Sequence, residues 1–271
     1  MSRGTPFPAF FNVKISYFSF NRGCVNVSDV FVDPDGILPV DKPAGMPSHV
    51  IVTTLRRKFG FVKVGHGGTL DPDATGLLLI LLGKGTKISD KVMGGDKTYT
   101  GTIRFGAATT TQDRLGDITE EHSTEHLTEA DILAAIQRDF VGDLFQKPPM
   151  YSAVKIAGQP LYKLAVRGEE CEREERFIHV YKFAITAFRA DAQRAEADFE
   201  VRCTKGTYIR TLAHDLGQAL GVGAHLCALR RTASGQVTLQ HATPFAELLE
   251  MPRVAIENRV IPCMNYLEGL F

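Results

Sequence analysis

The stretch Gly65-His66-Gly67-Gly68-Thr69-Leu70-Asp71-Pro72-Asp73-Ala74-Thr75-Gly76, followed by the apolar run Leu77–Leu82, is the part of the sequence around which the remaining motifs are arranged. Four glycines and a proline in this stretch predict a loop. Functional side chains are concentrated on loops that a rigid scaffold holds in place. The apolar run after it is the longest in the chain, and it is far too short to span a membrane.

Outward from this loop, the hydrophobic pattern predicts interleaved strands and helices. Alternating residues predict strands at 37–40, 98–105, 182–188 and 197–203. Apolar stripes with terminal signals predict helices at 48–59, 127–140 and 208–220. Ser48 and Thr128 are the expected N-caps, and Gly221 ends the last helix. Because no regular βαβ repeat is present, we expect an α+β fold with a mixed sheet.

The composition excludes several classes of protein. The chain has 271 residues, 44% of them hydrophobic, and equal numbers of basic and acidic side chains, 31 each. Such a chain forms a globular core, and it can bind a polyanion only through a local basic face. Its five cysteines are odd in number and widely spaced, which argues against a disulfide scaffold and a thiolate zinc site. We therefore expect a cytoplasmic protein, without a secretory signal or a membrane segment.

Asp71 is the first candidate for chemistry. A carboxylate can act as a nucleophile, and a covalent intermediate divides one hard step into two easier ones. The alternative is structural, because Asp-Pro commonly opens a turn. Asp71-Pro72-Asp73-Ala74-Thr75 also resembles the nucleophile loop of the magnesium-dependent haloacid-dehalogenase-type phosphatases. In that class a buried strand runs directly into the first aspartate, and the glycines before Asp71 do not allow such a strand.

Further motifs occur in separate parts of the chain. They are Gly36–Gly45, Asp96–Tyr99 with Gly106–Asp113, Gln146–Lys155 continuing to Gly168, Lys205–Leu212 with Asp215–Gly217, and Gly223–Arg231. Together with the Asp71 loop, and in this order, they resemble the TruB family of tRNA pseudouridine synthases. The resemblance extends from Gly36 to about residue 240. It implies a pseudouridine synthase fold, in which helices and loops flank a mixed, mostly antiparallel sheet.

The family resemblance implies an activity. The family converts uridine 55 in the T-loop of tRNA to pseudouridine: the glycosidic N–C bond breaks, the uracil rotates, and a C–C bond forms to the same sugar. Since no redox step and no net water are involved, we expect no cofactor and no metal. The expected partner is the T-arm of tRNA with its uridine flipped out, and no obligatory protein partner is expected. A non-catalytic RNA-binding or RNA-folding protein on the same scaffold is a second alternative, beside the phosphatase.

The resemblance also implies catalytic residues. Asp71 matches the catalytic aspartate, acting as the nucleophile or as the base that starts glycal formation. Tyr99 matches the tyrosine that stacks on the target base. Arg210 matches the arginine that pairs with the aspartate, and a nearby cation favours the ionised carboxylate.

Four more positions are expected to bind the substrate. Tyr208 and Leu229 match residues that line the uracil pocket. His66 matches a histidine near the flipped nucleotide, and Lys42 lies in the first matching block. Without the resemblance, each would be interpreted as an ordinary core or loop residue.

The resemblance also divides the chain into three expected parts. Residues 1–35 form an N-terminal extension of unknown structure: an added strand, a disordered leader or a wrongly assigned start. Residues 36–245 form the catalytic domain. Residues 246–271 form a short tail, too short for the RNA-binding domain of the PUA type that bacterial members usually carry.

A phosphate-binding rim is expected from scattered basic side chains that folding could bring together. They are Arg56, Arg57, Lys58, Lys63, Lys84, Lys87, Lys205, Arg210, Arg230 and Arg231.

Overall fold

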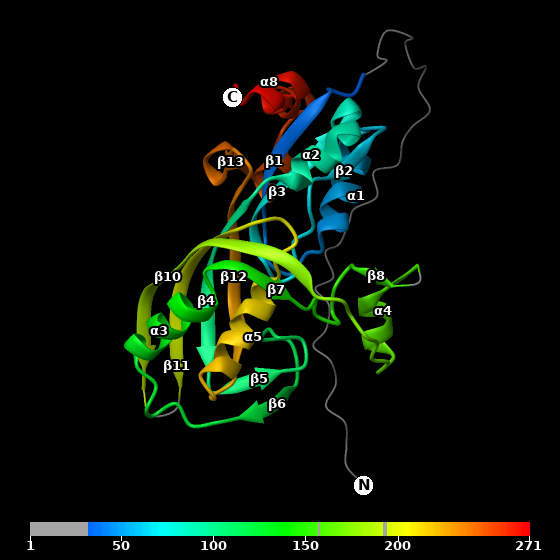
Figure 1. Cartoon of the computed structure of the whole chain (residues 1–271). Coiled ribbons are helices and arrows are strands. Elements are labelled where there is room, and N and C mark those ends of the chain that lie inside the picture. The colour runs from blue at the N-terminus through cyan, green and yellow to red at the C-terminus, as the bar shows by residue number, and fades with distance from the viewer. Residues whose placement is uncertain (1–31, 157, 192–193) are drawn as a thin grey trace. The chain divides into compact units, whose positions relative to one another are not determined.

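A mixed sheet is the framework of the molecule (Figure 1). The computed structural model describes residues 32–156, 158–191 and 194–271, and all statements below concern these residues. The compact unit that they form begins at Asp33, so the predicted extension 1–35 falls mostly outside the described residues. No helix within the described ranges is long and apolar enough to cross a membrane.

The sheet is mostly antiparallel, as predicted. Its main strands, in spatial order, are β14 (Thr243–Pro244), β1 (Gly36–Lys42), β3 (Thr75–Leu82), β12 (Ala224–Ser234), β4 (Lys97–Phe105), β11 (Ala195–Cys203), β10 (Arg176–Ala190) and β7 (Gly142–Gln146). Shorter strands β2 (Val64–His66), β13 (Val237–Thr238) and β15 (Ile261–Pro262) pair with β3, β12 and β1. Among the described strands of this sheet, only β1 with β14 and β3 with β12 are parallel pairs. The α+β class and the mixed, mostly antiparallel sheet are confirmed.

Helices and two small hairpins surround the sheet. The helices are α1 (Ser48–Phe59), α2 (Ser89–Gly94), α3 (Glu129–Asp139), α4 (Leu161–Val166), α5 (Ile209–Ala219), α6 (Phe245–Glu250), α7 (Arg253–Glu257) and α8 (Cys263–Glu268), with 3-10 turns at Gly83–Ile88 and Leu239–His241. The hairpins are β5 (Ala107–Thr109) with β6 (Ile118–Glu121), and β8 (Lys155–Ile156) with β9 (Gln159–Pro160).

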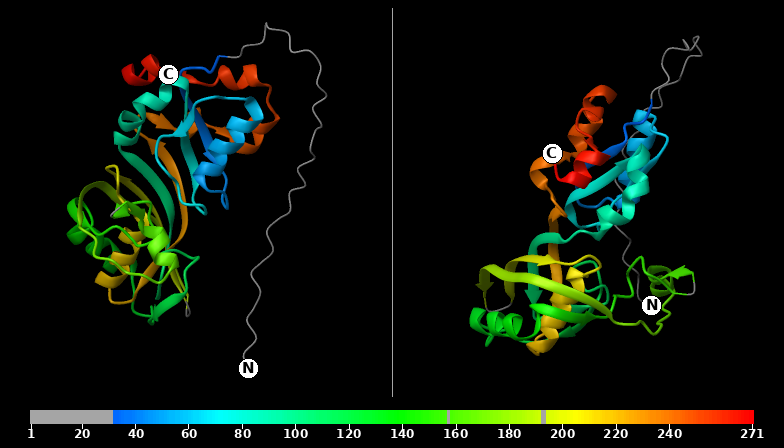
Figure 2. Two further views of the ribbon diagram at one scale, coloured as in Figure 1. Left: turned by 90° about the vertical axis from the view of Figure 1, so that its right-hand side faces the viewer. Right: turned by 45° about the horizontal axis from the view of Figure 1, so that its top comes forward.

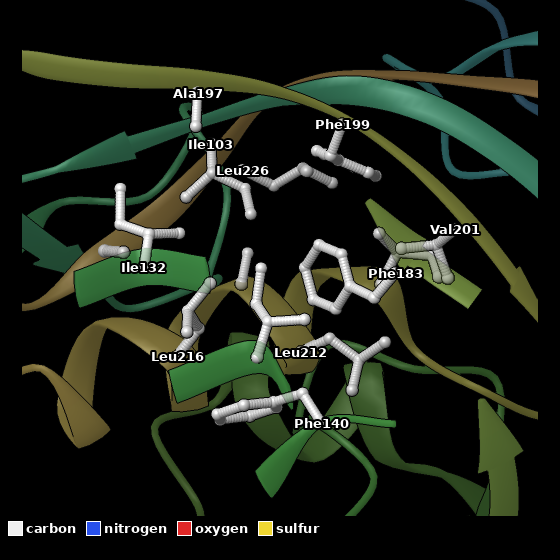
Figure 3. Close-up of a cluster of buried hydrophobic side chains, with 14 of the residues drawn as sticks. Ile103, Ile132, Phe140, Phe183, Ala197, Phe199, Val201, Leu212, Leu216 and Leu226 are labelled. Atoms are coloured by element: carbon white, nitrogen blue, oxygen red, sulfur yellow. The ribbon is translucent and has the colours of Figure 1, made fainter. Parts of the chain in front are cut away.

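Strand β12 lies between β3 and β4 and joins the two halves of the sheet. Figure 2 shows β4 and β12 running side by side through both halves of the molecule. On one half, α3 and α5 cover the sheet and bury side chains such as Ile132, Leu212 and Phe199 (Figure 3). On the other half, α1 and α6 pack against β1 and β3.

The apolar run Leu77–Leu82 is strand β3, and it has no alternation because both of its faces are covered. Leu78, Ile80 and Leu82 contact the cluster under α1, whereas Leu77, Leu79 and Leu81 contact a third cluster on the opposite face. The sequence of a strand that is buried on both faces is a continuous apolar run.

Two local predictions are wrong. The loop predicted at 65–76 is shorter, because Gly65 and His66 belong to β2, and the last two residues begin β3.

Helix α1 has its predicted bounds, but Pro47 is the N-cap. Ser48 exchanges two hydrogen bonds of 2.9 Å with the backbone N–H and C=O of Leu70, so it fixes the loop before Asp71. By contrast, the predicted capping box of Thr128 and Asp131 is confirmed.

Candidate active site

A cavity of about 620 Å³ lies where the Asp71 loop meets the beginning of α5. Its walls come from the loop at 68–71, from β4 and β12, from the segment 152–154, from the first residues of β10 and from the segment 205–210. We call it the active-site cavity. Five of the seven predicted site residues line it: Asp71, Tyr99, Tyr208, Arg210 and Leu229.

The carboxylate of Asp71 is partly open to this cavity. A tight turn begins here, in which the Asp71 carbonyl accepts the backbone N–H of Ala74 at 3.1 Å. The turn expected from the Asp71-Pro72 dipeptide is therefore present. The side chain of Asp71, the first residue of this turn, still faces the cavity. The Asp71 side chain is 41% exposed. An exposed acid at the wall of a cavity can reach a bound substrate.

Arg210 holds Asp71 in a two-bond fork. Its Nε donates to Oδ2 of Asp71 at 2.8 Å, and its Nη2 faces Oδ1 at 3.3 Å. The remaining donors bind the carbonyls of Thr111 at 3.0 Å and Tyr151 at 2.9 Å. Arg210 is only 4% exposed. Because its donors are directed at fixed acceptors, the guanidinium is a rigid positive charge beside the carboxylate.

Gln146 fixes the beginning of α5, and sequence reasoning missed this role. Its side-chain amide accepts the backbone N–H of Tyr208 at 2.7 Å and donates to the carbonyl of the same residue at 3.0 Å. Gln112, the only described non-glycine residue with a positive φ (62°), accepts a hydrogen bond from Thr211 at 2.9 Å. The sequence offered one indication of these roles: both glutamines lie in motifs that resemble the family. These contacts hold Tyr208 and Arg210 in register with the cavity.

The phenol of Tyr99 lies in β4, opposite Arg231 in β12. Burial raises the pKa of Tyr99 above its usual range, so the phenol stays neutral at physiological pH. Leu229 and Tyr99 pack against both large core clusters, which places them at the joint between the two halves of the sheet. The cavity therefore has an aromatic wall and an aliphatic wall beside a carboxylate.

Lys42 and His66 do not line the cavity within the described residues. Lys42 is fully buried, and its ammonium donates to the carbonyls of Pro43 (2.9 Å), Met46 (2.7 Å) and Pro72 (2.9 Å). Burial lowers the pKa of Lys42 to about 8. Since its three N–H donors are used, Lys42 supports the Asp71 turn from behind instead of offering a donor to a ligand.

His66 lies in β2, and its Nδ1 is buried without a hydrogen-bond partner among the described residues. Burial, reinforced by the positive charge of Arg231, lowers the pKa of His66. The imidazole is therefore neutral near pH 7.

The basic rim is only partly present. Arg56, Arg57 and Lys58 are exposed at the end of α1, and Lys205 is exposed at the cavity. The prediction is wrong for Arg210 and for Arg231.

Arg231 is buried and cannot reach a phosphate. It donates to the carbonyls of Leu77 at 2.7 Å, Gly68 at 3.1 Å and Thr69 at 3.4 Å. Arg231 thus joins β12 to the segment before Asp71. Arg230 is paired instead with Asp41 at 2.6 Å.

The geometry disfavours the phosphatase alternative. Residues 67–70, which precede Asp71, are not a strand, so Asp71 does not stand at the end of a buried strand.

Comparisons with known proteins identify the family of the chain. The family model described as TruB family pseudouridylate synthase (N terminal domain) matches residues 56–209, and the one described as tRNA pseudouridylate synthase B C-terminal domain matches 210–263. The boundary between the two matches falls in the first turn of α5, between Ile209 and Arg210.

Individual relatives give the same result. The chain is 50% identical over 228 residues to tRNA pseudouridine synthase B of Opitutus terrae, covering 84% of this chain and 92% of the relative. It is 44% identical to the protein of the same name from Symbiobacterium thermophilum, covering 83% and 79%. A solved chain in the crystal structure of a Cbf5-Nop10-Gar1 complex superposes with a TM-score of 0.64 and 28% identity, over 84% of this chain and 60% of that one.

Proposed function

The chain belongs to the TruB family of pseudouridylate synthases, and from this premise we propose that it converts uridine 55 in the T-loop of tRNA to pseudouridine. The enzyme class, an isomerase that makes pseudouridine, follows from the family. The position of the uridine, 55, and its place in the T-loop of tRNA are what we propose. The main support is the pair of hydrogen bonds between Arg210 and Asp71 at the wall of a cavity large enough for a nucleoside.

We assign the central role to Asp71. In the nucleophilic route, a carboxylate oxygen bonds to C1′ of the ribose as the N–C bond breaks. The rotated uracil then forms its C–C bond at C1′, displaces the carboxylate and loses the proton from its C5. In the glycal route, the carboxylate instead removes a proton from C2′ as the N–C bond breaks, which leaves a C1′–C2′ double bond. The rotated uracil then bonds through C5 to C1′, C2′ regains a proton, and C5 loses its own. Both routes use the Asp71 carboxylate, and the guanidinium of Arg210 holds it in place at 2.8 Å.

Tyr99, Leu229 and Tyr208 are proposed to bind the flipped base. An enzyme that acts on a base must first take it out of the stack, and stacking on flat or apolar side chains offsets the cost. The neutral phenol of Tyr99 supports such a contact, and the aliphatic wall at Leu229 faces the same cavity. Lys42 and His66, which we expected to bind substrate, are better explained as supports of the Asp71 loop and its neighbouring strand.

The test is to map pseudouridine at nucleotide resolution in a tRNA transcript treated with the purified protein. We expect modification at position 55, and none in a transcript with cytidine there. Modification at another uridine would contradict the proposed position while leaving the enzyme class intact. Tight tRNA binding with no modification would favour the non-catalytic alternative.

A further inference from the structure

An exposed pair of phenylalanines lies at the mouth of the active-site cavity. Phe145 of β7 and Phe177 of β10 are direct cross-strand partners, with ring centroids 5.9 Å apart and planes at 72°. They are 70% and 60% exposed, although their neighbour Ile178 is buried in the core. Two large apolar rings left together in water indicate a surface that binds something.

The pair is continuous with the site of chemistry. Phe177 lines the same cavity as Asp71, together with the exposed cations Arg176 and Lys205. Strand β7 is the last strand at its end of the described sheet, so no further strand of the described chain covers the pair.

The outward face of β10 continues the aromatic surface beyond Phe177. His179 and Tyr181 follow on the same face, with ring centroids 4.5 Å apart, and the guanidinium of Arg202 lies 5.0 Å from the centre of the Tyr181 ring. Two acidic groups near these rings are engaged in ion pairs: Asp143 contacts His179 at 2.6 Å, and Asp96 contacts Arg202 at 3.3 Å. Glu174 and Glu175 are exposed and precede Arg176 in the chain. Flat rings near cations that have no ion-pair partner among the described residues suit a ligand that is both aromatic and anionic.

We propose that Phe145 and Phe177 form a stacking platform for an unpaired base of the RNA strand next to the reacting uridine, with Arg176 and Lys205 contacting its phosphates. Proteins bind single-stranded RNA by stacking bases on aromatic side chains beside a positively charged path. The proposal rests on the proposed function, because it takes the RNA that enters the cavity as the ligand.

The test measures the Kd for a T-arm stem–loop RNA, with the full chain. Phe145→Ala and Phe177→Ala should each weaken binding by roughly 5- to 100-fold, the range found for loss of one base–aromatic stack. Phe177→Trp should bind nearly as tightly as the wild type. Phe177→Leu keeps an apolar side chain but loses the ring, so it should behave like Phe177→Ala. The loss should be larger in Kd than in the single-turnover rate at saturating RNA, because the proposed contact is with a base beside the reacting uridine.

Two controls make the result specific. Val254→Ala removes a side chain that is also 60% exposed, on α7, and it should leave Kd unchanged. RNAs with one abasic nucleotide at each position around the target give a double-mutant cycle with Phe177→Ala. At the stacked position the two changes should not add, whereas elsewhere they should.

Unchanged affinity of the alanine variants, or additivity at every abasic position, would overturn the platform. A wild-type dimer in sedimentation that dissociates in Phe145→Ala would also overturn it, because the pair would then be a contact between copies. The proposed position is judged separately, by whether the wild type modifies uridine 55. Failure of one proposal is therefore distinguishable from failure of the other.

Discussion

The guanidinium of Arg210 is nearly inaccessible to solvent, whereas the Asp71 carboxylate that it binds through two atoms is partly exposed. The ion pair therefore has a fixed, buried side and an open, reactive side. Arg210 is further anchored by two backbone carbonyls, so its position does not depend on the substrate.

Replacing Arg210 should affect turnover far more than binding. Arg210→Lys keeps the charge but cannot reproduce the fork or reach both carbonyls, so kcat should fall by at least about tenfold, and Arg210→Ala should be worse. Arg57→Ala and Lys58→Ala, at exposed positions, should instead weaken tRNA binding in a salt-dependent way with little change in kcat. Single-turnover rates and Kd values at several salt concentrations distinguish the two patterns. A purely salt-dependent binding defect in Arg210→Ala would mean that this residue contacts phosphate.

Asp71→Asn should abolish isomerisation while preserving the fold. The amide oxygen can still accept a hydrogen bond from Arg210, but the negative charge is lost. We expect turnover to fall by roughly four orders of magnitude, the scale for loss of a catalytic nucleophile, with tRNA Kd within a few-fold of the wild type. Pseudouridine formation and a filter-binding assay measure both quantities. Substantial residual turnover would show that another group performs the chemistry.

Lys42→Met should destabilise the protein strongly. The substitution removes the charged donor that the carbonyls of Pro43, Met46 and Pro72 share, and we expect it to lower the free energy of unfolding by about 3 kcal/mol. Lys84→Met is the matched control, because it removes an exposed ion pair with Asp35 and should lower the free energy of unfolding much less. Urea denaturation at pH 7 compares the two. Equal effects would contradict the supporting role of Lys42.

The pKa of Lys42 adds a pH dependence. Its folded-state pKa of about 8 lies below the ordinary value of 10.5, so between these pH values the unfolded chain binds more protons at this site. This contribution makes the free energy of unfolding rise with pH from about 8 to 10.5. The slope over that window should therefore be smaller in Lys42→Met than in the wild type. A steeper slope in the variant would contradict the lowered pKa of Lys42 in the folded protein.

Gly76→Ala should prevent stable packing of β3 against β12. Gly76 has a φ of +99°, and a Cβ there would lie 2.3 Å from the backbone oxygen of Arg231. We expect a loss of several kcal/mol, seen as a large fall in Tm. In Gly94→Ala the new methyl group meets no atom within 4 Å and φ is not positive, so Tm should be nearly unchanged. A mild effect at Gly76 would show that the two strands can move apart.

Deleting residues 1–31 should leave both activity and Tm nearly unchanged, because the family resemblance begins only at Gly36. Deleting residues 1–35 should lower Tm. Asp33 accepts the backbone N–H groups of Val62 and Lys63 at 2.7 and 2.8 Å, and Asp35 pairs with Lys84. Thermal unfolding of the two truncated chains tests the difference. A large loss from the shorter deletion would show that residues 1–31 stabilise the fold.

Local signals in the sequence predicted three of the helices and four of the main strands. The helix at 48–59, the capping box at Thr128 and the strand at 98–105 depend on neighbouring residues, and they are present within a residue or so. Strand β3 was not predicted as such, because a strand with both faces covered has no alternation.

The candidate site was predictable only in part. The pairing of Arg210 with Asp71 was expected from the resemblance, and the structure places the two side chains in contact. The burial of Lys42 and Arg231 was not predictable, because their partners are backbone carbonyls far away in the sequence. A cation that binds carbonyls has no complementary residue that a sequence could reveal.

The central place of β12 has a consequence for synthesis of the protein. The joint between β3 and β4 is made by residues 224–234, which leave the ribosome long after both of those strands. Until then, each has an unpaired edge, and such edges are prone to pair with other chains. Closure by a distant segment is also slow, because it depends on contacts far apart in the chain. The nascent protein therefore has no working catalytic centre until translation is nearly complete, and co-translational chaperones have most to protect in that interval.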